Sequence, residues 1–126
     1  MLAFDALHVG QRWGPHAQAL DDALFQRWAR VYGGDGRSAT ADPGMVVVAQ
    51  MRAIMALIDP PSGSVHAGQR FEVLRLPGRG ETVLTTIECL AKEMKRGRRW
   101  GTLCCTGSDA AGQPVYRGES VSLWGA

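Results

Sequence analysis

The most continuous run of apolar residues in the chain lies at 43–58, where Arg52 is the only charged residue. A helix that is apolar on nearly all sides is normally buried in a core or in a membrane. At about 16 residues with a charge near its middle, this run is shorter than the roughly 20 apolar residues that a membrane span requires. Its three valines would suit a strand, but strands usually end within about eight residues. The pattern therefore predicts a buried helix that begins at Pro43 and ends at Asp59-Pro60-Pro61.

A second helix is predicted over about 20–32, because apolar residues recur there at helical spacing. These residues are Leu20, Leu24, Phe25, Trp28 and Tyr32. Asp21 or Asp22 can cap the start of this helix, and Gly33-Gly34 can end it. The stretch 35–42 is polar and predicts a loop that connects the two helices.

The second half of the chain has the composition of strands separated by glycine-containing turns. Four strands are predicted, at 65–76, 82–94, 99–107 and 115–124. The stretch 4–13 predicts an opening strand or arm, with Gly14-Pro15 as the turn after it. Because the helices come first and the strands afterwards, we expect an α+β domain in which one antiparallel sheet curves around the apolar helix. Residues 1–126 are expected to form a single domain.

Composition and charge narrow the possible functions. With 45% hydrophobic and 21% charged residues, the chain resembles an ordinary globular protein. A net charge of +2 gives no reason to expect a nucleic acid, and we expect no membrane partner. The three cysteines predict buried free thiols in a reducing compartment, and the N-terminus lacks a signal-peptide pattern, so a cytoplasmic location is expected. No His/Cys/Asp/Glu set has metal-binding spacing, and we expect neither a metal nor a cofactor.

The order of elements resembles the hot-dog fold, in which an antiparallel sheet wraps around a long central helix. Val65-His66-Ala67-Gly68-Gln69-Arg70-Phe71, followed by Leu76-Pro77 and Gly80-Glu81-Thr82, resembles a strand pair of MaoC-like hydratases and dehydratases. The segment from Asp109 to Gly118 resembles the closing hairpin of that family. The resemblance implies a hydratase or dehydratase that acts on an acyl thioester of coenzyme A or of an acyl carrier protein. It also implies a homodimer, or a heterodimer with another hot-dog protein.

The loop before the apolar helix departs from the pattern of that family. Its hydratases carry the motif G-D-x-N-P-x-H-x-D. Gly34-Asp35 matches the start and Asp42 the end, but Thr40 replaces the histidine and Arg37-Ser38 replaces Asn-Pro. Threonine cannot exchange a proton near neutral pH as imidazole can. Two alternatives therefore stay open: a non-catalytic acyl-thioester-binding protein or subunit partner of a hydratase, and an acyl-CoA thioesterase.

Two residues are candidates for the chemistry. Asp35 can act as a general base or orient a water, although an aspartate between glycines is also a common turn residue. His66 is the only histidine of the strand region and can replace the missing proton carrier, or can serve only as a strand residue. Thr40, Gly44 and Met45 are placed at the substrate, because the start of the apolar helix offers free N–H groups to a thioester carbonyl.

Two further expectations concern arginines. Arg96 and Arg98 are placed at the phosphates of coenzyme A, because they belong to a basic cluster at a predicted turn with Lys92, Lys95 and Arg99. The same cluster can instead protect a sheet edge from pairing. Arg52 is expected to be buried and paired with an acid such as Glu72, or to lie at an interface or ligand, because an unpaired buried charge is costly.

Overall fold

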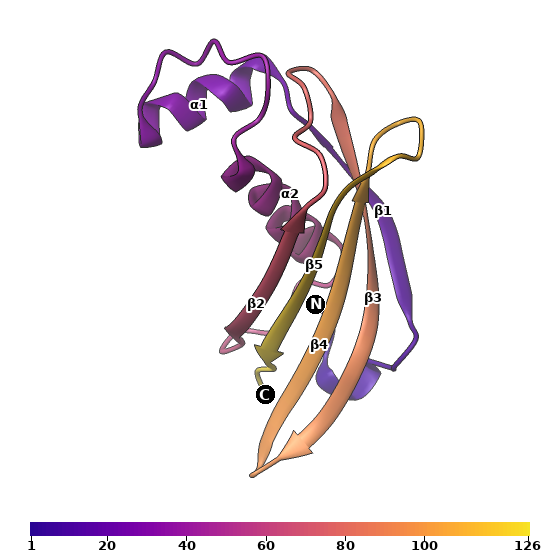
Figure 1. Cartoon of the computed structure of the whole chain (residues 1–126). Coiled ribbons are helices and arrows are strands. Elements are labelled where there is room, and N and C mark those ends of the chain that lie inside the picture. Colours follow the sequence, from indigo (N-terminus) through magenta and orange to yellow (C-terminus); the bar gives the residue numbers. More distant parts are fainter.

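The computed structural model describes residues 1–126 and contains one curved sheet and two α-helices (Figure 1). In chain order the elements are η1 (Phe4–Ala6), β1 (Arg12–Ala19), α1 (Asp22–Tyr32), α2 (Pro43–Leu57), β2 (Val65–Val73), β3 (Thr82–Lys95), β4 (Arg98–Ser108) and β5 (Pro114–Leu123). The strands are antiparallel, in the order β1-β3-β4-β5-β2. The sheet curves around α2, and α1 lies beyond the N-terminal end of α2 (Figure 1). The predicted α+β class is confirmed.

Helix α2 begins at the predicted residue because the chain supplies a cap there. The Asp42 carboxylate accepts a hydrogen bond from the Gly44 N–H at 2.9 Å, and Pro43 occupies the first turn. Six side chains of the helix are buried against the sheet: Met45, Val46, Ala49, Gln50, Ala53 and Ile54. Gln50 is the one polar member, and its amide donates to Gln69 Oε1 on β2 at 3.0 Å. The buried helix therefore carries its own polar tie to the edge strand.

One side of α2 is not covered, which corrects the expectation of a helix buried on nearly all sides. Its residues line a shallow hollow of about 430 Å³: Val48, Met51, Arg52, Met55 and Ala56. We call these five residues the open face of α2. Met55 has 55% of its surface exposed, which is unusual for a large apolar side chain in the middle of an apolar run. The sheet of one chain is too narrow to surround the helix.

Arg52 belongs to this open face, so the prediction of a buried ion pair with Glu72 is wrong. The Arg52 guanidinium is exposed and donates to Gln18 Oε1 at 3.1 Å. Because the side chain stays in water, no buried charge needs compensation.

Helix α1 begins two residues after the start of the predicted range and ends at the predicted residue. Asp21 is the N-cap, and its carboxylate accepts from the Leu24 N–H at 2.9 Å. Gly33 ends the helix with a φ of 95°, a conformation that glycine adopts without steric cost. The helix buries Phe25 and leaves Tyr32 69% exposed at its last turn.

Strand β1 is the element that the sequence predicts least well. The expected strand or arm over 4–13 is wrong, because the chain there forms only η1 and the strand starts at Arg12. β1 continues through Gly14-Pro15, where the ladder to β3 shifts register. As an edge strand, β1 tolerates a proline. Gly14 is required there, since a Cβ would lie 2.7 Å from the carbonyl oxygen of Thr85.

The four predicted strands of the second half are all present, with ends that differ by one to three residues. The largest difference is at β2, which stops at Val73. The N–H groups of Leu74 and Arg75 both donate to the Val115 carbonyl, and this turns the chain away from the ladder. β2 pairs only with β5, so its outer edge is free.

The centre of the core is organised around Tyr116, which is 1% exposed. Its hydroxyl shares a hydrogen bond of 2.7 Å with Thr85 Oγ1, and its ring stacks on Phe71 at 5.1 Å. Burial raises the pKa of Tyr116, so the phenol stays neutral. The three cysteines are buried free thiols, as predicted, and burial raises the pKa of Cys105 to about 12.

We expect Gly107→Ala to destabilise the fold, because a Cβ at Gly107 would overlap the ring of Tyr116. The free energy of unfolding should fall by about 2 kcal/mol, the usual cost of overpacking a core. The control is Gly68→Ala, whose Cβ would meet nothing closer than 3.8 Å. Urea unfolding compares the two variants, and equal stabilities would contradict the packing seen around Tyr116.

Candidate functional site

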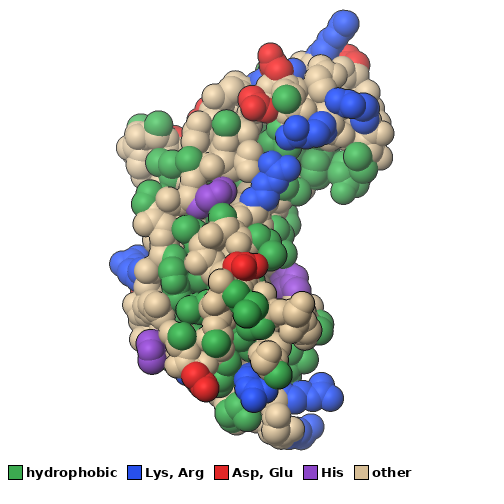
Figure 2. All heavy atoms as spheres, turned by 180° about the vertical axis from the view of Figure 1, so that it is seen from behind, with side chains coloured by type: hydrophobic (Ala, Val, Ile, Leu, Met, Phe, Trp, Pro, Cys, Tyr) green, Lys and Arg blue, Asp and Glu red, His purple; other side chains and the backbone are tan.

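A pocket of about 390 Å³ lies between α1, the loop that follows it and the first turn of α2. Its wall is apolar and aromatic, formed by Phe25, Trp28 and Met45, and Asp35 and Thr40 lie on its rim. Seen from behind, the molecule is hollowed beneath the overhanging end that carries α1, with hydrophobic side chains on the walls (Figure 2). We call this the α1–α2 pocket. It is the one place where an apolar wall, a carboxylate and a hydroxyl meet.

The loop at the rim holds Asp35 at the surface. One oxygen of the Asp35 carboxylate accepts from the Arg37 N–H at 3.0 Å, and the other makes no hydrogen bond. The Ser38 hydroxyl donates to the Thr40 carbonyl at 2.7 Å, and Thr40 forms a β-bridge with Gly78. The turn described for aspartate between glycines is therefore present, and it leaves one carboxylate oxygen free at the pocket.

The start of α2 does not offer the free N–H groups on which the placement of Gly44 and Met45 rested. The Gly44 N–H is taken by the Asp42 carboxylate, and the Met45 N–H donates to the Asp42 carbonyl at 2.9 Å. Gly44 also serves packing, since a Cβ there would lie 2.7 Å from the Trp28 ring. Met45 lines the pocket through its side chain instead.

Arg79 fixes the rim, and the sequence gave no reason to single it out. Its guanidinium donates to the Asp22 carboxylate and to the Gly36 carbonyl, each at 2.6 Å, and to the Ser38 carbonyl at 3.2 Å. It also lies over the Phe25 ring, 4.5 Å from the centroid. One side chain therefore joins α1, the pocket loop and the β2–β3 connection. Its partners are mostly main-chain carbonyls, which leave no mark on the sequence.

A second charged cluster holds the β2–β3 connection itself. The Arg75 guanidinium donates two hydrogen bonds to Glu81, at 2.9 and 3.0 Å, and a third to Asp109 at 2.9 Å. The Gly78 N–H also donates to Glu81. The hydrogen bonds from Arg75 and then from Gly78 lower the pKa of Glu81 to about 2. Because Gly78 bridges Thr40, this cluster supports the pocket rim from below.

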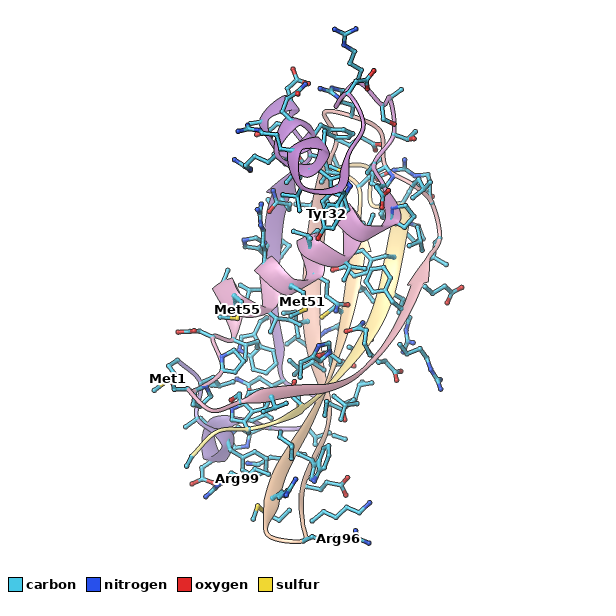
Figure 3. All side chains as sticks on the ribbon, turned by 90° about the vertical axis from the view of Figure 1, so that its left-hand side faces the viewer. Met1, Tyr32, Met51, Met55, Arg96 and Arg99 are labelled. Carbon is cyan, nitrogen blue, oxygen red and sulfur yellow. The ribbon has the colours of Figure 1, made fainter.

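The other predicted site residues lie elsewhere in the chain. His66 lines a cavity of about 250 Å³ beside Met51 and Met55, at the opposite end of α2 from Asp35. Arg96 and Arg98 lie at the β3–β4 turn, and Arg96 and Tyr32 mark opposite ends of the molecule (Figure 3). The structure therefore brings Asp35, Thr40 and Met45 together, places Gly44 beside them, and separates His66 and the two arginines from them within one chain. No helix combines the length and the apolar character that crossing a membrane would need.

Comparison with known proteins identifies the fold. No protein-family model and no curated protein matches the chain. The chain is similar to a MaoC-like dehydratase from Rhodospirillum rubrum, with a TM-score of 0.83 and 15% identity over 100% of this chain and 99% of that one. R-hydratase PhaJ1 from Pseudomonas aeruginosa gives 0.79 and 21% over 98% and 85% of the two chains. A Mycobacterium tuberculosis protein with a double hot-dog fold gives 0.81 and 19%, over 98% of this chain and 44% of that one.

These identities are low, so the likeness establishes the fold and leaves the activity to be argued from the site. The chain has the hot-dog fold that its sequence resembles, and its structural neighbours include MaoC-like dehydratases and R-hydratases.

We expect Arg79→Ala to loosen the pocket loop, because three carbonyl and carboxylate oxygens lose a charged donor. The free energy of unfolding should fall by about 2 kcal/mol, as for lost hydrogen bonds to a charged group. Amide exchange at residues 36–40 should also accelerate. Arg37→Ala is the matched control, because the Arg37 side chain is exposed and makes no hydrogen bond. Unchanged exchange in Arg79→Ala would argue against this positioning role.

We expect the contribution of Glu81 to stability to vary with pH. Because its pKa in the folded state is about 2, against 4.5 ordinarily, the contribution is complete above about pH 4.5 and is lost as the pH falls toward 2. Glu81→Gln should therefore destabilise the protein at pH 7 and differ progressively less from the wild type in acid. Urea unfolding at pH 7, 4 and 3 measures this difference. A difference that stays constant with pH would contradict the ion pair.

Proposed function

We propose that this hot-dog protein binds an acyl thioester of coenzyme A or of an acyl carrier protein and catalyses addition of water to its acyl chain, or the reverse elimination. The observation that carries the proposal is the α1–α2 pocket, which joins an apolar wall to a carboxylate with one free oxygen. The wall suits an acyl chain, because burial of apolar surface drives its binding. The carboxylate suits removal of a proton from water.

The structural neighbours support the same class of chemistry. Two of them are a MaoC-like dehydratase and an R-hydratase, and the likeness to each covers at least 98% of this chain. Within this proposal Asp35 is the general base and Met45 contacts the acyl chain. Thr40 contributes a hydroxyl at the rim.

We propose in addition that the protein works as a dimer, with a second copy or with another hot-dog chain. The open face of α2 supports this, because an exposed apolar stripe along a core helix is a usual mark of an interface. One neighbour has a double hot-dog fold, and this chain matches less than half of it. Buried free thiols suit the reducing cytoplasm, which we propose as its location.

A second candidate function is acyl-thioester binding without catalysis, as the subunit partner of a catalytic hydratase. The observation that favours it is the content of the α1–α2 pocket, which holds no imidazole. Thr40 stands where the MaoC-like motif has histidine.

The test is incubation of the protein with crotonyl-CoA and with 3-hydroxybutyryl-CoA, monitoring enoyl absorbance and free thiol together. We expect the enoyl absorbance of crotonyl-CoA to fall without thiol release. Asp35→Asn should reduce this rate by about 10²-fold or more, the usual loss of a general base. Asp5→Asn, which changes an exposed carboxylate outside the pocket, is the control.

The other outcomes separate the alternatives. Thiol release would make the protein a thioesterase. Binding of crotonyl-CoA, followed by quenching of tryptophan fluorescence, without turnover would favour the non-catalytic subunit. Absence of both binding and turnover in a folded protein would overturn the proposed function.

A further inference from the structure

This inference rests on the proposed function and starts from a missing proton donor. Addition of water to an enoyl thioester needs a group that removes a proton from water and a group that delivers one to carbon. The α1–α2 pocket supplies Asp35 for the first step and no titratable partner suited to the second. His66 is the histidine that faces the same side of the sheet as α2, because it lines a cavity with Met51 and Met55. Within one chain it lies at the wrong end of that helix.

The free edge of β2 and the open face of α2 lie on one side of the molecule. Both face the viewer in Figure 3, where Met51 and Met55 lie on α2 above the edge strand. A second copy covers both features at once if the two sheets join edge to edge with their helices on the same side. The symmetry axis then stands perpendicular to the joined sheet, and the two β2 strands run antiparallel.

Charges along β2 select the register of this pairing. Arg70 and Glu72 are exposed and form no ion pair, and across β5 they lie opposite Glu119 and Arg117. An axis through Phe71 places Arg70 opposite the partner's Glu72, so positive and negative residues alternate across four strands. An axis through Arg70 or Glu72 would place like charges opposite each other. A slip by one residue would turn the helices to opposite faces.

The selected register brings the partner's His66 to the pocket rim. His66 precedes Phe71 by as many residues as Leu76 follows it, so it comes level with the segment 74–78 of the other chain. Gly78 at the end of that segment bridges Thr40, and the Pro77 carbonyl accepts from the Ala41 N–H at 2.9 Å.

The same register covers exposed apolar surface. Three large apolar side chains lie at the two ends of this edge with 40% or more of their surface exposed: Val65, Leu74 and Leu76. In the antiparallel pair the first of them meets the other two across the axis. Their mutual burial removes apolar surface from water on both chains.

We propose that each active site is shared between two copies, with Asp35 from one chain and the partner's His66 as the proton donor. In hydration, Asp35 accepts a proton from water while the water oxygen bonds to C3 of the enoyl chain. The partner's His66, as imidazolium, donates a proton to C2. The proton on Asp35 then passes through water to the imidazole, and both groups return to their starting states. Dehydration follows the same steps in reverse.

The first test mixes two inactive variants. Asp35→Asn and His66→Gln homodimers should each lose about 10²-fold or more of the crotonyl-CoA hydration rate. After unfolding and refolding together in equal amounts, half of the dimers are mixed, and each mixed dimer holds one intact site. Activity should recover to about one quarter of the wild-type value. His8→Gln, at an exposed histidine outside the pocket, should leave the rate unchanged.

An active wild type whose activity survives His66→Gln, or whose variants do not complement, would overturn the shared site and leave the proposed function standing. The second test needs no activity. Thr40→Cys and His66→Cys proteins, refolded together, should be joined by a short bismaleimide into a covalent dimer, since the native cysteines are buried. Thr40→Cys mixed with Gln113→Cys, exposed at the β4–β5 turn, is the control. Cross-linking without hydration would overturn the proposed function alone, and absence of cross-linking would overturn the shared site.

Discussion

The covering of α2 is the constraint on which the rest of the structure depends. The helix is apolar along nearly its whole length, and burying it against a curved sheet is the main source of stability available to the chain. Five strands cover its inner side, and α1 closes over its N-terminal end. What stays uncovered is the α1–α2 pocket at one end and the open face along one side. The pocket and the proposed interface therefore have the same origin.

The pocket rim is built mostly from small and polar residues, so apolar burial cannot fix it. Charged side chains do this instead. Arg79 binds the loop carbonyls and Phe25, while Arg75 and Glu81 hold the segment whose Gly78 bridges Thr40. The rim position therefore depends on the β2–β3 connection. This is also the segment that the second copy approaches in the proposed dimer, so the site and the interface share one support.

The sequence predicts the elements that follow one periodicity and fails where the partner of a residue decides. Helix α2 and strands β2 to β5 follow from apolar runs and turns, and the family resemblance extends them to the hot-dog fold. β1 was missed because Gly14-Pro15 reads as a turn, although an edge strand admits it. The burial of Arg52 was wrong because an apolar run does not indicate which side lacks cover. Arg79 was missed because its partners are carbonyls far away in the chain.

The placement of Thr40 decides how the proposed functions relate. Its backbone is tied to Ser38 and Gly78, so the loop holds a hydroxyl where the MaoC-like motif holds an imidazole. An imidazole at this point has to come from outside the loop, and in the proposed dimer the partner's β2 provides one. Catalysis then requires association, and a single chain binds the thioester without converting it. Hydratase and non-catalytic subunit thus become two states of one surface, distinguished by which hot-dog chain pairs with the free edge of β2.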